Sequence, residues 1–297
     1  MRVGVVGLGV MGKPMVERLL ATGHRVFVHN RTREKMRGLD ALGAQWADAP
    51  RDVAAASEVV LTVVTDPAAV EAVSFGDAGI AAGLSEGAVH CDMSTVSPAA
   101  SREMAERYAA AGLRFVQAPV LGSKRQVLAG ELLVFAGGEA EAISRCEPAW
   151  HAFSHRIWRV GAPEQAAAAK LACNMLIAHM ILGLGQSLLF ARCHGVDPAR
   201  LLEILGASAL GAPMFASKGQ TMVGGDFAAN FYVRHMVKDL TLAASAAAEC
   251  GLCMPLNAAN RELFASAVRQ GWGDLDYSAV VKVLEGLNGL GGATPER

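Results

Sequence analysis

Two sets of residues in this sequence are suited to chemistry. Near the N-terminus, Gly7-Leu8-Gly9-Val10-Met11-Gly12 has the G-x-G-x-x-G spacing of a loop that holds the phosphates of a dinucleotide. Far along the chain, Lys170 is the only charged residue between Gln165 and Ala191. A lysine ammonium can stabilise the negative charge that develops on a carbonyl oxygen during hydride transfer, and it can donate the proton as general acid. Together the two sets indicate a nicotinamide-dependent reduction.

The glycine loop is flanked by the elements that a nucleotide site requires. The apolar run at 2–6 is typical of a strand, helix-forming residues follow at 13–21, and a second apolar run lies at 25–28. The three glycines permit, in order, a tight strand-to-helix turn, a close approach of the backbone to a pyrophosphate, and close packing of helix and strand. The N-terminus of the helix then offers N–H groups and a positive dipole end to the phosphates.

The end of the second strand favours one cofactor. An acidic residue there would bind the ribose hydroxyls of NAD and repel a 2′-phosphate. This chain has Asn30 instead, followed by Arg31, Thr32 and Arg33. A guanidinium can pair with a phosphate through two hydrogen bonds, and a hydroxyl or an amide can add another. We therefore expect NADP(H), although the two arginines are also compatible with an ordinary solvated helix start.

Lys170 has two possible roles. Asn174 lies four residues further on, about one helical turn away on the same face, where it could hold the lysine or bind a substrate hydroxyl. An ammonium in apolar surroundings must find a partner or a cavity, because unpaired burial is costly. The alternative is a lysine whose stem lies along the apolar surface while its charge reaches water.

The pattern of elements predicts two domains. Apolar runs separated by helical segments indicate an α/β domain at 1–162, a Rossmann-type doubly wound parallel sheet. The further strands are expected at 59–64, 88–92, 114–117, 132–136 and 156–160. From Pro163 to about Cys193 the sequence predicts one long helix, and no strand pattern follows it. The domain at 163–297 is therefore expected to be all-helical, and only the tail at 291–297 has a low-complexity composition.

Composition narrows the class of protein. A net charge of −1 suggests neither a nucleic acid nor a membrane surface as partner. The almost continuous apolar stretch 171–191 is either a membrane span or a core helix, and its polar interruptions favour a buried central helix. Cys250 and Cys253 have a redox-like spacing but no second pair, and the histidines have no metal spacing, so we expect no metal. A strand that begins at residue 2 argues against a signal peptide and favours the cytoplasm.

Several further motifs occur in order along the chain. They are Gly-Leu-Gly-Val-Met-Gly-Lys-Pro-Met (7–15), Asp-Met-Ser-Thr-Val (92–96), Ala-Pro-Val-Leu-Gly-Ser (118–123), Lys-Leu-Ala-Cys-Asn (170–174), and Phe231 with Lys-Asp-Leu (238–240). Together they resemble the β-hydroxyacid dehydrogenase family. Within that family, the Gly-Ser-Lys run at 122–124 and the ending at 276–280 are most similar to the NADPH-dependent glyoxylate/succinic semialdehyde reductases.

The resemblance implies roles for individual residues. Lys170 matches the catalytic acid/base, and Asn174 matches the asparagine that supports it. The residues that match a substrate and nicotinamide pocket are Thr95, Gly122, Phe231 and Asp239. Val64, Thr65, Lys238 and also Thr95 match positions beside the cofactor.

Two positions depart from the family pattern. Leu121 stands where the family usually has the serine of Ala-Pro-Val-Ser-Gly, and Gln117 stands where Asp or Glu is common. Leucine cannot donate a hydrogen bond to a substrate carboxylate. The backbone N–H groups of residues 121–123 could still bind one, and Ser123 or Lys124 could compensate. Otherwise the substrate lacks a carboxylate or is bulkier.

These observations predict an NADPH-dependent reductase that converts a small aldehyde, of the succinic semialdehyde or glyoxylate type, to a hydroxyacid. A related dehydrogenase or an imine reductase-like enzyme with a non-carboxylate substrate is the nearest alternative. A non-catalytic NADP-binding scaffold is a third, against which the presence of Lys170 argues. The apolar helical region also predicts a homodimer or a homotetramer.

Overall fold

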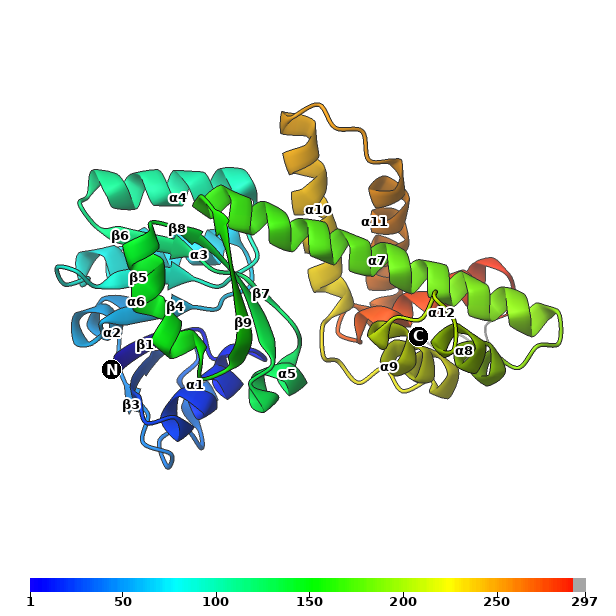
Figure 1. Ribbon diagram of the computed structural model, residues 1–297, viewed down its shortest axis with the longest axis horizontal. Coiled ribbons are helices and arrows are strands. Elements are labelled where there is room, and N and C mark those ends of the chain that lie inside the picture. The colour runs from blue at the N-terminus through cyan, green and yellow to red at the C-terminus, as the bar shows by residue number, and fades with distance from the viewer. Residues whose placement is uncertain (291–297) are drawn as a thin grey trace. The chain divides into compact units, whose positions relative to one another are not determined.

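The computed structural model describes residues 1–290, and the low-complexity tail at 291–297 lies outside the described residues. The chain divides into two compact units, Met1–Ala172 and Cys173–Arg297 (Figure 1). We predicted that the second domain starts at residue 163, the first residue of the long helix α7 (Pro163–Cys193), and the division falls inside that helix.

A nine-stranded sheet forms the centre of the first unit. Its strand order is β3-β2-β1-β4-β5-β6-β8-β7, and β9 lies beside β8. The strands are β1 (Arg2–Val6), β2 (Arg25–His29), β3 (Gln45–Trp46), β4 (Val59–Thr62), β5 (Val89–Asp92), β6 (Arg114–Gln117), β7 (Val120–Leu121), β8 (Leu132–Gly138) and β9 (Ser154–Gly161).

The first six strands form the predicted Rossmann-type arrangement. They are parallel, in the order 3-2-1-4-5-6, and the order reverses between β1 and β4. Ligands of such sheets bind beyond the carboxyl ends of the strands at this reversal. At that edge Val6 is the register partner of both His29 and Thr62, so the loops after β1, β2 and β4 begin side by side.

The far edge of the sheet is mixed rather than wholly parallel. Strand β8 pairs antiparallel with β6 and β7, and parallel with β9. The connection from β7 to β8 contains only the short helix α5 (Lys124–Ala129), whereas a parallel neighbour needs a longer crossover. The two-residue strands β3 and β7 carry too few residues for an apolar pattern, and the sequence did not predict them.

Helices cover both faces of the sheet (Figure 1). Side chains alternate along a strand, so Val3 and Val5 pack with α1 and α6, whereas Val6 packs with α2 on the opposite face. The helices of this unit, besides α5 and the start of α7, are α1 (Gly12–Ala21), α2 (Pro50–Ala56), α3 (Pro67–Phe75), α4 (Pro98–Ala110), α6 (Ala140–Trp150) and the 3₁₀ segments η1 (Arg33–Met36) and η2 (Ile80–Ala82).

The second unit is helical, as predicted. Between residues 194 and 290 the structure has helices, turns and one isolated β-bridge, between Tyr232 and Asp276. Ile181, Leu240 and Phe264 lie in its core. Its further elements are α8 (Pro198–Gly206), α9 (Pro213–Gly224), α10 (Val233–Glu249), α11 (Pro255–Ala267), the π-helical η3 (Val268–Trp272), the 3₁₀ η4 (Tyr277–Val280) and α12 (Val281–Leu287).

Helix α7 has the bounds that the sequence predicted. Pro163 is its first residue, Cys193 its last, and Gly195 follows with φ +76°. With a mean hydropathy of 1.6 in its most apolar window, α7 is long and apolar enough to cross a membrane. Core helices have the same composition, and Ala178 and Ile181 of α7 are fully buried in the second unit.

Candidate functional site

The glycine loop between β1 and α1 has the shape of a phosphate-binding loop. Gly7 has φ +107°, a conformation that favours glycine. A Cβ on Gly12 would lie 1.9 Å from the Gly7 carbonyl oxygen, whereas a Cβ on Gly9 would meet nothing within 4 Å. Two of the glycines therefore serve the turn itself, and the third faces open space that a phosphate could fill.

The start of helix α1 suits the same ligand. Its N-cap residue, Met11, makes no side-chain hydrogen bond to the first turn. The first N–H groups of a helix lack partners within the helix, and a phosphate is a good acceptor for them. The residues present thus fit a dinucleotide, with Gly7, Leu8, Gly9, Val10, Met11 and Gly12 as the predicted contact residues.

Asn30 joins the glycine loop to the end of β2. Its side-chain oxygen accepts a hydrogen bond from the Leu8 backbone N–H at 2.9 Å, and its Nδ2 donates to the Thr32 carbonyl at 2.9 Å. The amide therefore positions two predicted cofactor segments. Arg31 and Thr32 follow directly, and both are exposed.

A groove continues from this strand end. Its volume is about 470 Å³, and Arg33, Arg37 and Trp46 are among the residues that line it. The guanidinium of Arg33 lies 5.3 Å from the centre of the Trp46 ring, a cation–π arrangement. The groove also has Glu34 and Asp40 in its lining, so its charged residues are of both signs.

The loop after β4 carries Val64 and Thr65. The Val64 backbone N–H donates to Ser94 Oγ at 3.0 Å, which joins this loop to the loop after β5 that holds Thr95. Asp66 caps helix α3 by accepting from the Ala69 N–H at 2.9 Å. The predicted contact residues Val64, Thr65 and Thr95 therefore lie on two connected loops.

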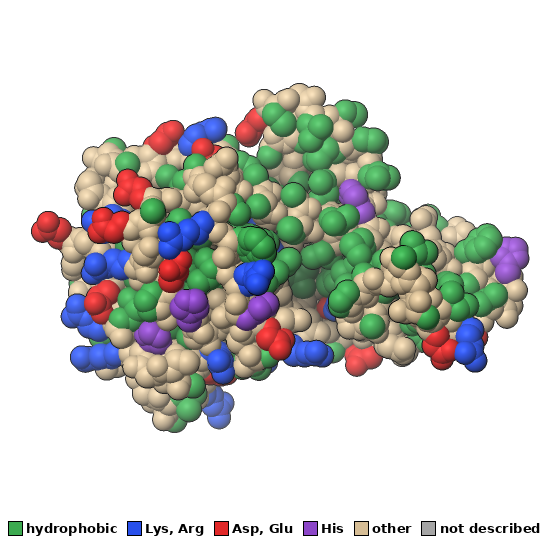
Figure 2. Space-filling view, viewed as in Figure 1, with side chains coloured by type: hydrophobic (Ala, Val, Ile, Leu, Met, Phe, Trp, Pro, Cys, Tyr) green, Lys and Arg blue, Asp and Glu red, His purple; other side chains and the backbone are tan. Residues whose placement is uncertain are grey.

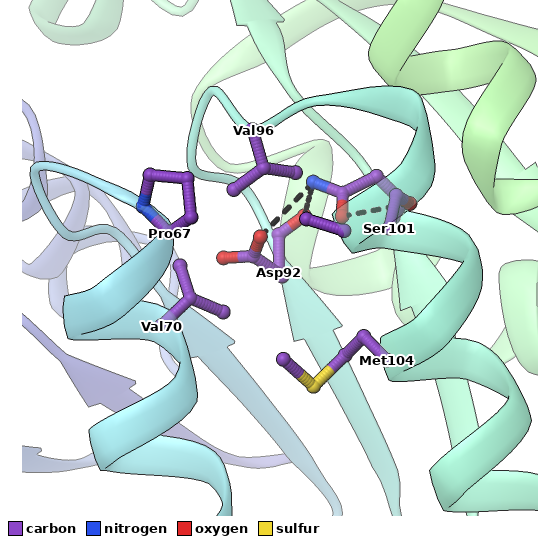
Figure 3. A pocket seen from close by; sticks show the side chains of 8 residues that line it. Pro67, Val70, Asp92, Val96, Ser101 and Met104 are labelled. Atoms are coloured by element: carbon purple, nitrogen blue, oxygen red, sulfur yellow. Dashed lines mark hydrogen bonds between the residues drawn. The ribbon is translucent and has the colours of Figure 1, made fainter. Parts of the chain in front are cut away.

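Beneath these loops is a buried polar network that the sequence did not reveal (Figure 3). Asp92 is fully buried, and its Oδ1 accepts from Thr62 Oγ1 at 2.6 Å and from the Ser94 N–H at 3.1 Å. Its Oδ2 accepts from Gln117 Nε2 at 3.0 Å. Burial raises the pKa of Asp92, and these hydrogen bonds oppose that rise.

The segment with the Leu121 departure is held by its own chain. Gly122 has φ +136°, and a Cβ there would lie 2.5 Å from a Leu132 methyl group. Ser123 donates both its backbone N–H and its hydroxyl to the Oε1 of Gln126, at the start of α5. Both donors of Ser123 are therefore engaged within the chain, and the role of Ser123 in place of the missing family serine stays a prediction.

Lys170 and Asn174 lie on α7, one turn apart, and the division between the units passes between them. Lys170 has 7% of its surface exposed in the whole chain. Asn174 is 3% exposed, and its Nδ2 donates to Asp239 Oδ2 at 2.6 Å. Lys238 Nζ lies 3.0 Å from the other oxygen of Asp239, so these two neighbouring residues of α10 form an ion pair.

Phe231 precedes α10 and packs against aromatic neighbours. Its ring centre is 5.8 Å from that of His235 and 5.9 Å from that of Tyr277, both in edge-on geometry. Burial and the charges of Lys238 and Arg234 lower the pKa of His235. No sequence motif singles out His235, although its spacing of three and four residues from Lys238 and Asp239 places it on their helix face.

The two halves of the chain match two family models. Residues 2–161 match the NAD binding domain of 6-phosphogluconate dehydrogenase, and residues 165–284 match the NAD-binding region of NADP-dependent 3-hydroxyisobutyrate dehydrogenase. Glyoxylate/succinic semialdehyde reductase 1 of Arabidopsis thaliana is 34% identical over 285 residues, which cover 96% of this chain and 99% of the reductase.

Solved structures agree with these matches. A 3-hydroxyisobutyrate dehydrogenase from Salmonella typhimurium is 28% identical and superimposes with a TM-score of 0.86, over 95% of this chain and 99% of the other. Psf3 in complex with NADP+ and 2-OPP is 25% identical, with a TM-score of 0.87 over 95% of this chain and 99% of that one.

Proposed function

We propose that this chain, which belongs to the β-hydroxyacid dehydrogenase family of NAD(P)-dependent oxidoreductases, is an NADPH-dependent reductase of small aldehydes. The substrates that we propose are of the succinic semialdehyde or glyoxylate type, as the printed name of the Arabidopsis relative suggests. The observation that carries the proposal is a buried lysine, Lys170, one turn from an amide that is bonded to a buried carboxylate.

The proposed preference for NADPH rests on charge. Asn30, at the end of β2, carries no carboxylate that would repel a 2′-phosphate, and Arg31 and Thr32 are exposed beside it. A guanidinium and a hydroxyl can both donate to a phosphate. The relative Psf3, which is solved with NADP+, supports the same cofactor.

A bound nicotinamide cofactor would supply the hydride for the proposed reaction. Lys170 would donate the proton to the carbonyl oxygen. A protonated lysine also stabilises the negative charge on that oxygen. Asn174 would orient the reacting groups, because the hydrogen bond to Asp239 fixes which way its own amide points. Phe231 would provide an apolar wall for the substrate.

A second candidate substrate is a carbonyl or imine without a carboxylate. Leu121 has no side-chain donor, and both donors of Ser123 are engaged with Gln126. A carboxylated substrate would therefore find few donors in this segment. This candidate keeps the same cofactor and the same role for Lys170.

NADPH oxidation tests both candidates. Succinic semialdehyde, glyoxylate, a neutral aldehyde of matched length and a cyclic imine would be compared, with wild type and Lys170→Ala. We expect turnover of a carboxylated aldehyde, and a loss of about 100- to 10,000-fold in kcat for the variant at unchanged NADPH affinity. Turnover of only neutral substrates would support the second candidate. Full activity of Lys170→Ala would refute the catalytic role.

We further propose that the protein is a homodimer or homotetramer in the cytoplasm. Hydrophobic side chains gather on a face of the helical unit (Figure 2), and Leu176, Phe190 and Leu256 are each more than half exposed. The six cysteines are all free thiols, which suits a reducing compartment. Light scattering of wild type and Phe190→Ser tests the assembly: a wild-type monomer would contradict it.

A further inference from the structure

Three neighbouring strands of the first unit end in polar residues that lie side by side. Thr62 is the last residue of β4, Asp92 of β5 and Gln117 of β6. Asp92 is the register partner of both Thr62 and Gln117. Because the strands are parallel, all three side chains lie at the edge of the sheet where the cofactor loops begin.

A buried carboxylate needs strong donors, since burial without them is costly. Asp92 has three donors, two side chains and one backbone N–H. Ser101, Val96 and Met104 of the surrounding pocket exclude solvent around it (Figure 3). Loss of any one of the three donors would therefore destabilise the buried carboxylate.

The Gln117 amide is fixed in one orientation. Its Nε2 lies within hydrogen-bond distance of three acceptors, namely Asp92 Oδ2 and the carbonyl oxygens of Asp92 and Ser94, at 3.0, 3.0 and 3.1 Å. Its Oε1 accepts from Ser101 Oγ at 3.1 Å. A flipped amide would present oxygen to three oxygens, so only the observed orientation satisfies all partners.

From Gln117 the contacts continue to both cofactor loops. The Gln117 amide donates a hydrogen bond to the Ser94 carbonyl, and the Asp92 carboxylate accepts one from the Ser94 N–H. Ser94 Oγ in turn accepts from the Val64 N–H at 3.0 Å. Thr95 and Thr65 are the next residues on these two loops.

We infer that Gln117 is a positioning residue for the nicotinamide-side loops, and that its neutral amide makes their placement independent of pH in the neutral and alkaline range. The inference rests on the proposed function, because it assumes that the loops carrying Val64 and Thr95 contact the cofactor. A carboxylic acid at position 117 could donate to Asp92 only while it held a proton.

The other titratable groups around Asp92 stay uncharged near neutral pH. Burial lowers the pKa of His90, on β5, to about 3. Burial raises the pKa of the Cys91 thiol, where Cys146 of α6 adds to the rise, and it raises the pKa of Tyr108, on α4. A change in this network between pH 6 and 9 would therefore come from the carboxylates themselves.

Gln117→Glu tests the inference through cofactor affinity, measured by NADPH fluorescence from pH 6 to pH 9. Two adjacent carboxylates share one proton at low pH and repel each other when both are ionised. We expect the ratio of the variant Kd to the wild-type Kd to rise about tenfold across this range, because one pKa unit of coupling corresponds to a tenfold change. The ratio removes the titration of NADPH itself.

Two further variants serve as controls. Gln270→Glu makes the same substitution at an exposed amide and should leave the ratio flat. Asp92→Asn combined with Gln117→Glu restores one amide and one carboxylate, and should remove the pH dependence of the ratio. A flat ratio for Gln117→Glu, or an equal slope in the double variant, would overturn the inference.

Should Gln117→Glu fail to fold, Gln117→Met keeps the shape of the side chain without its donors. We then expect a Kd about fivefold higher than in wild type at every pH, the size of one lost hydrogen bond. An unchanged Kd would contradict the positioning role. Wild-type protein that bound neither NADPH nor NADH would instead refute the proposed function, so the two failures are distinguishable.

Discussion

The Asn174 side chain donates a 2.6 Å hydrogen bond to Asp239, and both residues are almost fully buried within the second unit. This contact joins α7 to α10. Lys238 binds the other oxygen of the same carboxylate at 3.0 Å. Asp239 therefore fixes the amide of Asn174 from one side while its own charge is balanced from the other.

Removal of the Asn174 amide should destabilise the second unit. Asn174→Ala leaves Asp239 Oδ2 without this donor, and we expect the free energy of unfolding to fall by about 1–3 kcal/mol. Urea denaturation measures the change. Asn288→Ala, which removes an amide that donates to the Leu284 carbonyl at the exposed end of α12, is the control. Equal losses in the two variants would show that the contact with Asp239 is unimportant for stability.

Substitutions at two glycines of the phosphate loop should have different effects, one on cofactor affinity and the other on stability. Gly9→Ala adds a methyl group in open space, so its melting temperature should match wild type while cofactor affinity falls by about tenfold or more. Gly12→Ala would press a methyl group against the Gly7 carbonyl, and the melting temperature should fall. Calorimetry with and without NADPH gives both quantities. Unchanged NADPH affinity in Gly9→Ala would place the cofactor elsewhere.

Arg31→Ala tests the proposed cofactor preference. Loss of a charged hydrogen bond to the 2′-phosphate should raise KM for NADPH by about 10- to 100-fold and leave KM for NADH unchanged. Steady-state kinetics with both cofactors measure the effect. Arg51→Ala, another exposed arginine of the same unit, should change neither constant. A parallel rise for NADH would mean that Arg31 does not contact the 2′-phosphate.

His90 should make the stability of the first unit fall in mild acid. Its folded pKa is about 3, below the ordinary 6.5. Between these two values the imidazole binds a proton in the unfolded chain but stays neutral in the folded chain. This contribution is complete above pH 6.5 and is lost as pH falls, with a slope of up to about 1.4 kcal/mol per pH unit. Asp92, whose pKa is raised by burial, acts in the opposite sense, because its contribution to stability is lost as pH rises through its raised folded pKa.

The measurement is urea unfolding of wild type and His90→Gln between pH 7 and pH 5. His24, also with a lowered pKa, remains in both proteins, so the difference between the two slopes isolates His90. We expect the free energy of unfolding of the variant to change less steeply with pH, by the amount that corresponds to about one bound proton. Identical slopes would indicate that His90 is protonated in the folded protein.

Local patterns predicted the parts of the site that lie close together in the sequence. The glycine loop and the end of β2 each depend on a few consecutive residues and on backbone geometry, and the structure has both of them. The full extent of α7 was also predictable, because Pro163 and Gly195 mark its ends.

The buried network could not be predicted in the same way. Thr62, Asp92 and Gln117 are far apart in the sequence and meet only through the register of three strands. The sequence marks Gln117 as a departure from the family pattern, but it does not show which residues contact the Gln117 amide. His235 was missed because its relation to Phe231 depends on how a loop packs against α10.

The hydrogen bond from Thr62 to Asp92 has a spectroscopic consequence. A hydroxyl that donates its one proton to a carboxylate can only accept from His90 Nε2, 3.1 Å away, so the ring carries its proton on that nitrogen. This imidazole proton is buried, and it should exchange slowly with solvent. Its NMR signal would be a native probe next to the loops after β4 and β5, and cofactor binding could be followed there without any label.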